Sequence, residues 1–103
     1  MLDLAAAIED RHVVRFRYLS DPPRAWRWVQ PHVLFESHQG KALLDAVQIA
    51  GYTSNAAAGF PVWRQFDVAM ITELEALVDR FEPAPDLRLN AEKYARVLAA
   101  VGT

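Results

Sequence analysis

The stretch from Trp63 to Val68 contains the residues whose types and spacing best suit the binding of a ligand. Its residues alternate as they do in a strand that is buried on one side only. Arg64 therefore shares a face with Phe66 and Val68, whereas Trp63 lies on the opposite face. A guanidinium offers a planar fork of donors to a phosphate or a carboxylate. On an apolar face it would either clamp an anion or form an ion pair within the protein, and the sequence leaves both alternatives open.

Two further arginines and the tryptophans could extend such a site. Residues 13–19 alternate in the same way and place Tyr18 on the apolar face, with Arg15 and Arg17 on the other. Aromatic side chains next to basic ones stack bases in proteins that bind single strands, and the chain has three tryptophans. Tryptophans of a small domain can instead fill its core or a dimer interface. Arg15, Arg17 and Trp63 join the candidate ligand-binding residues on these face assignments.

Metal and catalytic chemistry have weaker support. His32, Glu36 and His38 share strand parity and could hold zinc, but their spacing spans an expected turn and no fourth ligand is evident. Solvated polar residues explain them better. The chain has no nucleophile elbow, phosphate-binding loop or dinucleotide fingerprint, and no convincing pair of acid and base. We therefore expect no metal site, no cofactor and no enzymatic activity.

Composition indicates the class of protein. The 103 residues suffice for a single domain, 1–103, and 52% hydrophobic with 23% charged residues is typical of a soluble globular chain. No apolar run approaches the roughly 20 residues of a membrane-spanning helix. The chain starts too acidic for a secretory signal, and the absence of cysteine suits a reducing compartment. We expect a cytoplasmic protein that does not engage a membrane.

Charge is distributed unevenly along the chain. The net charge of -2 argues against a surface that binds duplex DNA. Basic residues dominate between Arg11 and Lys41, and acidic residues dominate between Asp67 and Asp86. These two flanks could pair with each other or with a second copy of the chain, or the basic flank could form a local anion site.

A short helix and a series of strands are expected before residue 70. Periodicity predicts an amphipathic helix over residues 3–11 and strands over residues 13–19, 24–35, 41–52 and 62–69. The third of these strands could also be a buried helix, but turns on both sides favour a strand. Pro31 interrupts the second strand and implies a bulge or an edge position. Residues 51–61 are rich in small residues and predict a long loop.

The last third of the chain shows helical patterns. Residues 70–81 have helical spacing and a capping box formed by Thr72 and Glu75, so propensity alone predicts a helix there. Residues 89–101 predict a second amphipathic helix, with Asn90 as its N-cap.

Several of these features, in this order, resemble the WYL domain, a small Sm-like β-barrel found mostly in bacterial transcription regulators. The matching pieces lie in residues 7–18, 29–31, 40–44, 64–71 and 79–81. The sequence also departs from the family. The tripeptide that names the family falls on Ala42-Leu43-Leu44, where only the final leucine matches, and Met70 stands where the family often has arginine.

The resemblance implies a five-stranded barrel over about residues 12–82, with a turn and a last strand over residues 70–81 in place of a helix. With the two terminal helices, the expected fold class is mainly β with flanking helices (α+β). In this family the barrel binds a regulatory ligand, in some members single-stranded nucleic acid, and Arg64 and Tyr18 match family positions. The chain has no room for the DNA-reading domain of those regulators, so a DNA-binding partner protein is one expected partner.

Two functions are compatible with these observations. The first is a non-enzymatic regulatory module that senses a nucleotide, single-stranded nucleic acid or another small anion at the barrel face. Its ligand-binding residues would be Arg64, Tyr18, Arg15, Arg17 and Trp63. The alternative is a protein-interaction or homo-oligomeric assembly module with no small ligand, in which strand edges or the tryptophan-rich face pair between subunits.

Overall fold

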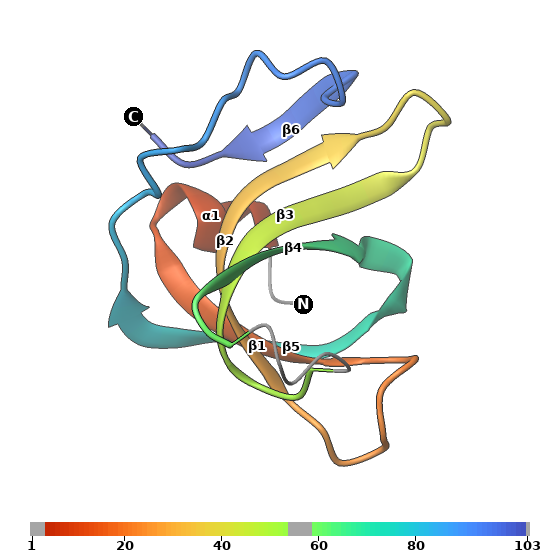
Figure 1. Ribbon diagram of the computed structural model, residues 1–103, viewed down its shortest axis with the longest axis vertical. Coiled ribbons are helices and arrows are strands. Elements are labelled where there is room, and N and C mark those ends of the chain that lie inside the picture. Colours follow the sequence, from red (N-terminus) through yellow and green to blue (C-terminus); the bar gives the residue numbers. More distant parts are fainter. Residues whose placement is uncertain (1–3, 54–58, 103) are drawn as a thin grey trace.

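The described part of the protein is mainly β, with one short helix (Figure 1). The computed structural model describes residues 4–53 and 59–102. Helix, strands and a 3-10 turn follow in the order α1 (Leu4–Glu9), β1 (His12–Tyr18), β2 (Arg27–Glu36), β3 (Ala42–Gly51), β4 (Val62–Asp67), η2 (Val68–Met70), β5 (Ile71–Arg80) and β6 (Arg96–Ala100). Among these residues, no helix is long and apolar enough to cross a membrane.

The strands form one antiparallel sheet. They pair in the order β4-β3-β2-β1-β5, and β6 also pairs with β2. β2 accommodates both neighbours because β1 pairs with its first half, up to Val29, and β6 pairs with its second half, from Val33 onwards. The register of β2 against β3 shifts between Pro31 and Val33, next to a proline that has no N–H to donate to the ladder. Of the two alternatives expected at Pro31, a bulge or an edge position, this register shift supports the bulge.

The sheet is curved but is not closed into a barrel. β4 and β5 are the two ends of the main path, and no pairing joins them in the described ranges. η2 links these two strands, and the Asp67 carboxylate caps it by accepting a hydrogen bond from the Ala69 N–H at 3.0 Å. The expected five-stranded barrel is therefore not confirmed, and β6 joins the sheet as a sixth strand.

Most elements expected before residue 70 are confirmed. α1 and β1 lie close to their predicted ranges, β2 begins at Arg27 rather than Arg24, and residues 42–51 form a strand rather than a buried helix. The expected long loop over residues 51–61 falls partly on residues 54–58, which lie outside the described residues.

The helix predicted over residues 89–101 is wrong. Residues 90–95 form turns and irregular backbone, and Arg96–Ala100 forms β6. Ala99 and Val101 are both buried, and their two-residue spacing is that of one face of a strand. Val97, near the start of β6, is 43% exposed. The second half of β2, which β1 leaves unpaired, offers ladder hydrogen bonds to this segment, and this tertiary pairing outweighs helical propensity.

The helical pattern of residues 70–81 also forms a strand, as the resemblance implied. β5 pairs with β1 in a register that shifts twice, and Glu73 has a positive φ of 49°. Such irregularities reset the alternation of a strand. Leu74 and Leu77, three residues apart, can therefore both pack against the core, which explains their helix-like spacing.

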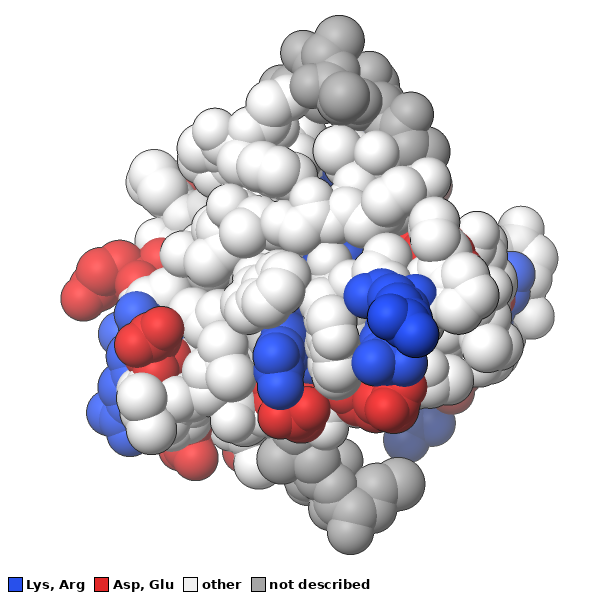
Figure 2. Space-filling model, turned by 90° about the horizontal axis from the view of Figure 1, so that it is seen from below, with Lys and Arg blue, Asp and Glu red and all other residues white. Residues whose placement is uncertain are grey.

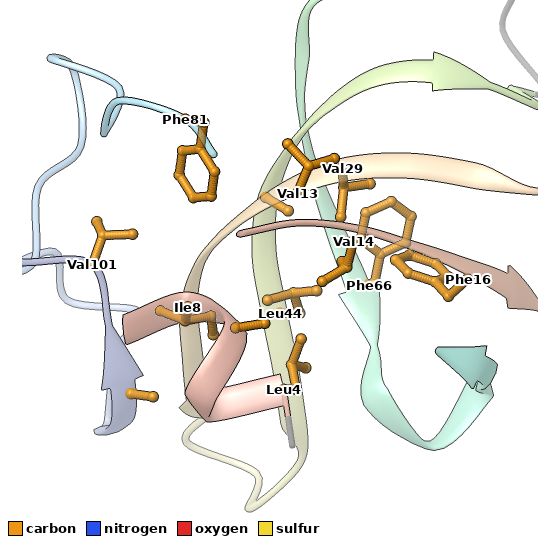
Figure 3. Packing of buried hydrophobic residues seen from close by; sticks show 13 residues of the cluster. Leu4, Ile8, Val13, Val14, Phe16, Val29, Leu44, Phe66, Phe81 and Val101 are labelled. Atoms are coloured by element: carbon orange, nitrogen blue, oxygen red, sulfur yellow. The ribbon is translucent and has the colours of Figure 1, made fainter. Parts of the chain in front are cut away.

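The core lies inside the curve of the sheet, with α1 across one end (Figure 3). Phe16 of β1 and Phe66 of β4 meet there edge to face, with ring centroids 5.0 Å apart. Ile8 of α1 is fully buried. Burial of each such side chain stabilises the fold by about 1.5–3 kcal/mol.

Candidate functional site

β4 presents its side chains to two different faces of the sheet. In the register of β3 and β4, Asp45 pairs with Gln65, and Ala46 pairs with Arg64. Paired residues of antiparallel strands project to the same face, so Gln65 shares the face of Asp45 and Arg64 shares the face of the buried Ala46. Trp63, the neighbour of Arg64, returns to the face of Asp45. The alternation predicted for this strand is confirmed, and we call the face of Asp45 the outer face.

An open hollow of about 400 Å³ lies on the outer face, between β3, β4 and the chain that follows β5. That volume is within the range of about 300–1,000 Å³ found for small-molecule sites. We call it the outer hollow. Its polar and aromatic lining on this face comprises Asp45, Trp63, Gln65, Asp86, Arg88, Lys93 and Tyr94. Arg64 also borders it, although pairing with Ala46 directs the Arg64 side chain to the opposite face.

Polar contacts attach residues 82–95 to the sheet at several points. Trp63 Nε1 donates to Asp86 Oδ2 at 2.9 Å, and the Ala84 N–H donates to His32 Nε2 at 3.0 Å. His38 Nε2 lies 2.8 Å from the carbonyl oxygen of Glu92 and can donate to it. This segment has neither helix nor strand, so these side chains set the shape of the outer hollow.

Asp45 lies at the floor of the outer hollow with its side chain only 5% exposed. Its Oδ2 accepts a hydrogen bond from Tyr94 Oη at 2.7 Å and also pairs with the Lys93 ammonium. Its buried Oδ1 has no hydrogen-bond partner among the described residues. Burial, followed by the hydrogen bond to Asp45, raises the pKa of Tyr94 and keeps its hydroxyl protonated as a donor.

His32 lies beneath the same wall and is fully buried. Its Nδ1 lies 2.7 Å from the Gln30 carbonyl, to which it can only donate, and its Nε2 accepts from the Ala84 N–H. The neutral imidazole satisfies both contacts. Burial lowers the pKa of His32, although the Gln30 carbonyl and the Asp86 charge act in the opposite direction.

Arg64 is held within the protein. Its Nη2 donates to Thr53 Oγ1 at 2.9 Å, and its buried Nε has no hydrogen-bond partner in the described part of the chain. Of the five predicted ligand-binding residues, Arg64 and Trp63 therefore border the same hollow, with their side chains on opposite faces of β4.

Arg15 and Arg17 are engaged elsewhere, with Trp26 and with β5. Their Cζ atoms lie 4.3 and 4.8 Å from the centre of the Trp26 ring. Arg15 Nη2 also donates to both carboxylate oxygens of Glu75 at 3.2 Å, and Arg17 Nε lies 3.2 Å from Glu73 Oε2. This agrees with the interpretation that the basic and acidic flanks pair with each other. The face drawn in Figure 2 likewise shows basic side chains beside acidic ones.

Tyr18 supports the sheet instead of lining the outer hollow. Its hydroxyl accepts a hydrogen bond from the Asp67 N–H at 2.8 Å, which joins the end of β1 to the end of β4. Its ring packs edge to face on Phe66, with centroids 5.4 Å apart. This hydrogen bond and the packing of the ring account for its position.

The buried guanidinium of this protein belongs to Arg27, which the sequence analysis did not single out. Arg27 Nε and Nη2 donate to the two carboxylate oxygens of Asp21 at 2.7 and 2.8 Å, and Nη1 donates to Gln48 Oε1 at 3.0 Å. Arg27 shares strand parity with Val29, which is fully buried, and this parity was the signal available in the sequence. Its acidic partner, Asp21, lies in the turn between β1 and β2, and the alternation of strand residues gives no information about turns.

The three residues considered as zinc ligands do not come together, and His32 is fully buried, although a solvated position was the preferred explanation. His32 and His38 are engaged with main-chain atoms at different parts of the segment after β5. Across residues 4–53 and 59–102, no group of three or more His, Cys, Asp or Glu side chains could hold a metal ion.

Comparison of the chain with models of protein families, with curated proteins and with solved structures found no match. Fold and site together define a small, mainly β domain with a ligand-sized hollow of mixed charge on its outer face.

Proposed function

We propose that the protein is a non-enzymatic binding module that senses a nucleotide or single-stranded nucleic acid in the outer hollow. The observation that carries this proposal is the gathering of the Trp63 indole with the cationic Arg88 and Lys93 around one open hollow. In proteins that bind single strands, bases stack on aromatic rings and basic side chains contact the phosphates. Gln65 adds an amide donor and acceptor to the same surface.

Trp63 is ordered before any ligand arrives. Asp86 accepts a hydrogen bond from its Nε1 at 2.9 Å, and the His32 ring contacts it edge to face with centroids 4.9 Å apart. A ring that is already fixed loses little conformational entropy when a base stacks on it. This arrangement therefore favours Trp63 over the other tryptophans as a stacking platform.

The charge of the outer hollow favours a short single strand or a single nucleotide. On the outer face, the cations of Arg88 and Lys93 are offset by the carboxylates of Asp45 and Asp86. A duplex would need many more phosphate contacts than these groups provide. Binding would thus depend on stacking and on hydrogen bonds to the base as well as on phosphate contacts.

The order of the strands supports a WYL-like regulatory domain as the family of this protein. α1 is followed by five strands that pair in the order β4-β3-β2-β1-β5, with β1 between β2 and β5. A small Sm-like barrel opened between β4 and β5 would have this strand order. In this proposal a separate DNA-reading protein would receive the signal of the bound ligand.

A fluorescently labelled single-stranded oligonucleotide tests the proposed function. Its anisotropy would be followed while protein is added at two salt concentrations, and we expect saturable binding that weakens as salt rises. Trp63→Ala should weaken binding about tenfold, since stacking on an aromatic ring is worth about 1–3 kcal/mol per base. Trp26→Ala is the matched control, because Trp26 contacts Arg15 and Arg17 away from the outer hollow. Absence of binding, or an equal loss in both variants, would contradict the proposal.

Assembly is the second candidate function, and open strand edges favour it. β4, β5 and β6 each pair on one side only within the described residues, and Val78 of β5 is 90% exposed. Unpaired edges of this kind can form hydrogen bonds with another chain. Light scattering over a range of protein concentrations would decide, because a monomer at every concentration would exclude assembly. An oligomer that dissociates in Val78→Lys would support it.

A further inference from the structure

Asp45 carries an unpaired acceptor at the floor of the outer hollow. It lies in the middle of the sheet, paired with Val33 of β2 and Gln65 of β4, and its side chain is 5% exposed. Tyr94 and Lys93 both bind its Oδ2, whereas no described residue binds its Oδ1. Buried polar atoms nearly always have a partner. An open acceptor among residues that line a hollow therefore points to a donor that arrives with a ligand.

We propose that Asp45 recognises a base that presents two adjacent N–H donors, so that guanine nucleotides are the preferred ligands of the outer hollow. This inference rests on the proposed function and names the base that it selects. An ionised carboxylate accepts hydrogen bonds on both oxygens and donates none. Guanine places its N1–H and N2–H groups side by side on one edge. Adenine and cytosine each place a donor next to an acceptor there, and uracil has one N–H between two carbonyl groups.

Lys93 is the group that a guanine base displaces. Asp45 Oδ1 is shielded from solvent, so a ligand can reach it only after a neighbouring group moves. The Lys93 side chain is 52% exposed, so its ammonium can leave for solvent, and the N–H donors of guanine would take its place on the buried carboxylate. Guanine would then bind Oδ1 and share Oδ2 with Tyr94, whose hydroxyl remains a donor. The released ammonium of Lys93 stays at the outer hollow, where it can pair with the phosphate.

Titration calorimetry with GMP and with inosine monophosphate tests the inference directly, because the two nucleotides differ only in the N2 amino group. We expect GMP to bind about tenfold more tightly, as hydrogen bonds to a charged group are worth about 1.5–3 kcal/mol. AMP should bind more weakly than GMP as well. Asp45→Asn replaces one acceptor oxygen with an amide and should remove the preference for GMP over inosine monophosphate and AMP.

Asp67→Asn is the matched control for this substitution. Asp67 lies on the same face of β4 and pairs with Lys41, but it does not line the outer hollow. The variant should keep the preference for GMP. The comparison of GMP with inosine monophosphate on the unaltered protein remains decisive even if Asp45→Asn does not fold.

The outcomes separate this inference from the proposed function. Equal affinities for GMP, inosine monophosphate and AMP would overturn the role of Asp45 and would leave nucleotide binding in place. This result is expected if a water molecule, and not the ligand, is the partner of Oδ1. A preference for GMP that survives Asp45→Asn would overturn the role of Asp45 too. Absence of binding by every nucleotide and oligonucleotide would overturn both proposals together.

Discussion

Removal of the Asp21 carboxylate tests how the interior of the sheet is stabilised. Asp21 accepts two hydrogen bonds from Arg27, and the two side chains are only 4% and 9% exposed. In Asp21→Ala the guanidinium would remain buried, with Gln48 Oε1 at 3.0 Å as its remaining side-chain acceptor among the described residues. One buried charge would then lose its counter-charge while staying out of water.

The magnitude follows from this geometry. Loss of one partner of a buried ion pair destabilises a protein by about 3–5 kcal/mol. The rings of Tyr18, Tyr52 and Phe66 have centroids 5.6, 5.6 and 5.4 Å from Arg27 Cζ, and they offset part of that loss. We therefore expect the free energy of unfolding to fall by about 3 kcal/mol, a large share of the about 5–15 kcal/mol that is typical of a domain.

Urea denaturation of three variants would test this reasoning. Asp21→Ala alone should show the full loss, whereas Asp21→Ala combined with Arg27→Met should regain most of it, since no unpaired charge remains. Glu75→Ala is the control, because its pair with Arg15 is 49% and 34% exposed and should contribute at most about 1 kcal/mol. The reasoning is refuted if Asp21→Ala costs no more than Glu75→Ala.

Three further predictions concern His32, Asn90 and Phe66. Burial lowers the pKa of His32 below its ordinary value of 6.5. The stability that the neutral imidazole contributes is therefore present above pH 6.5 and is lost as the pH falls through the lower pKa of the folded state. Urea denaturation between pH 7 and pH 5 should show this loss, and His32→Gln should reduce the dependence of the free energy of unfolding on pH. Asn90→Ala should change the free energy of unfolding by no more than about 0.5 kcal/mol, because no helix begins at Asn90; a loss near the roughly 1 kcal/mol of an N-cap would contradict β6. Phe66→Ala should lower the free energy of unfolding by about 3–5 kcal/mol, since the ring is 2% exposed. An unchanged midpoint in thermal denaturation would contradict the packing of this ring in the core.

Local patterns predicted most of the strands correctly. Alternation in residues 13–19 and 62–69, and turn composition around residues 41–52, led to β1, β4 and β3. These signals depend on neighbouring residues alone, because a half-buried strand exposes every second side chain. The helix over residues 89–101 was mispredicted because the pairing partner of that segment, the second half of β2, lies some 60 residues earlier in the chain.

The candidate site could be predicted only in part. Face assignment placed Trp63 and Arg64 on opposite sides of β4, and the register with β3 confirms this. Face assignment gave no information on which residues contact Trp63 and Arg64. Trp63 meets a segment that follows β5, and Arg64 meets Thr53, so their partners come from distant parts of the chain.

The amino-acid sequence by itself determined the strand faces and the absence of cysteine chemistry, and it limited Pro31 to a bulge or an edge position, because these depend on residue type and local period. Tertiary structure decided the rest. It buried Arg27 against Asp21 and paired Arg15 with Glu75. It also brought Tyr94 and Lys93 onto Asp45, nearly half the chain away, so that the outer hollow has an acidic floor. The reason is physical: a buried charge takes whichever partner the fold places beside it, and pairing between distant strands determines that placement.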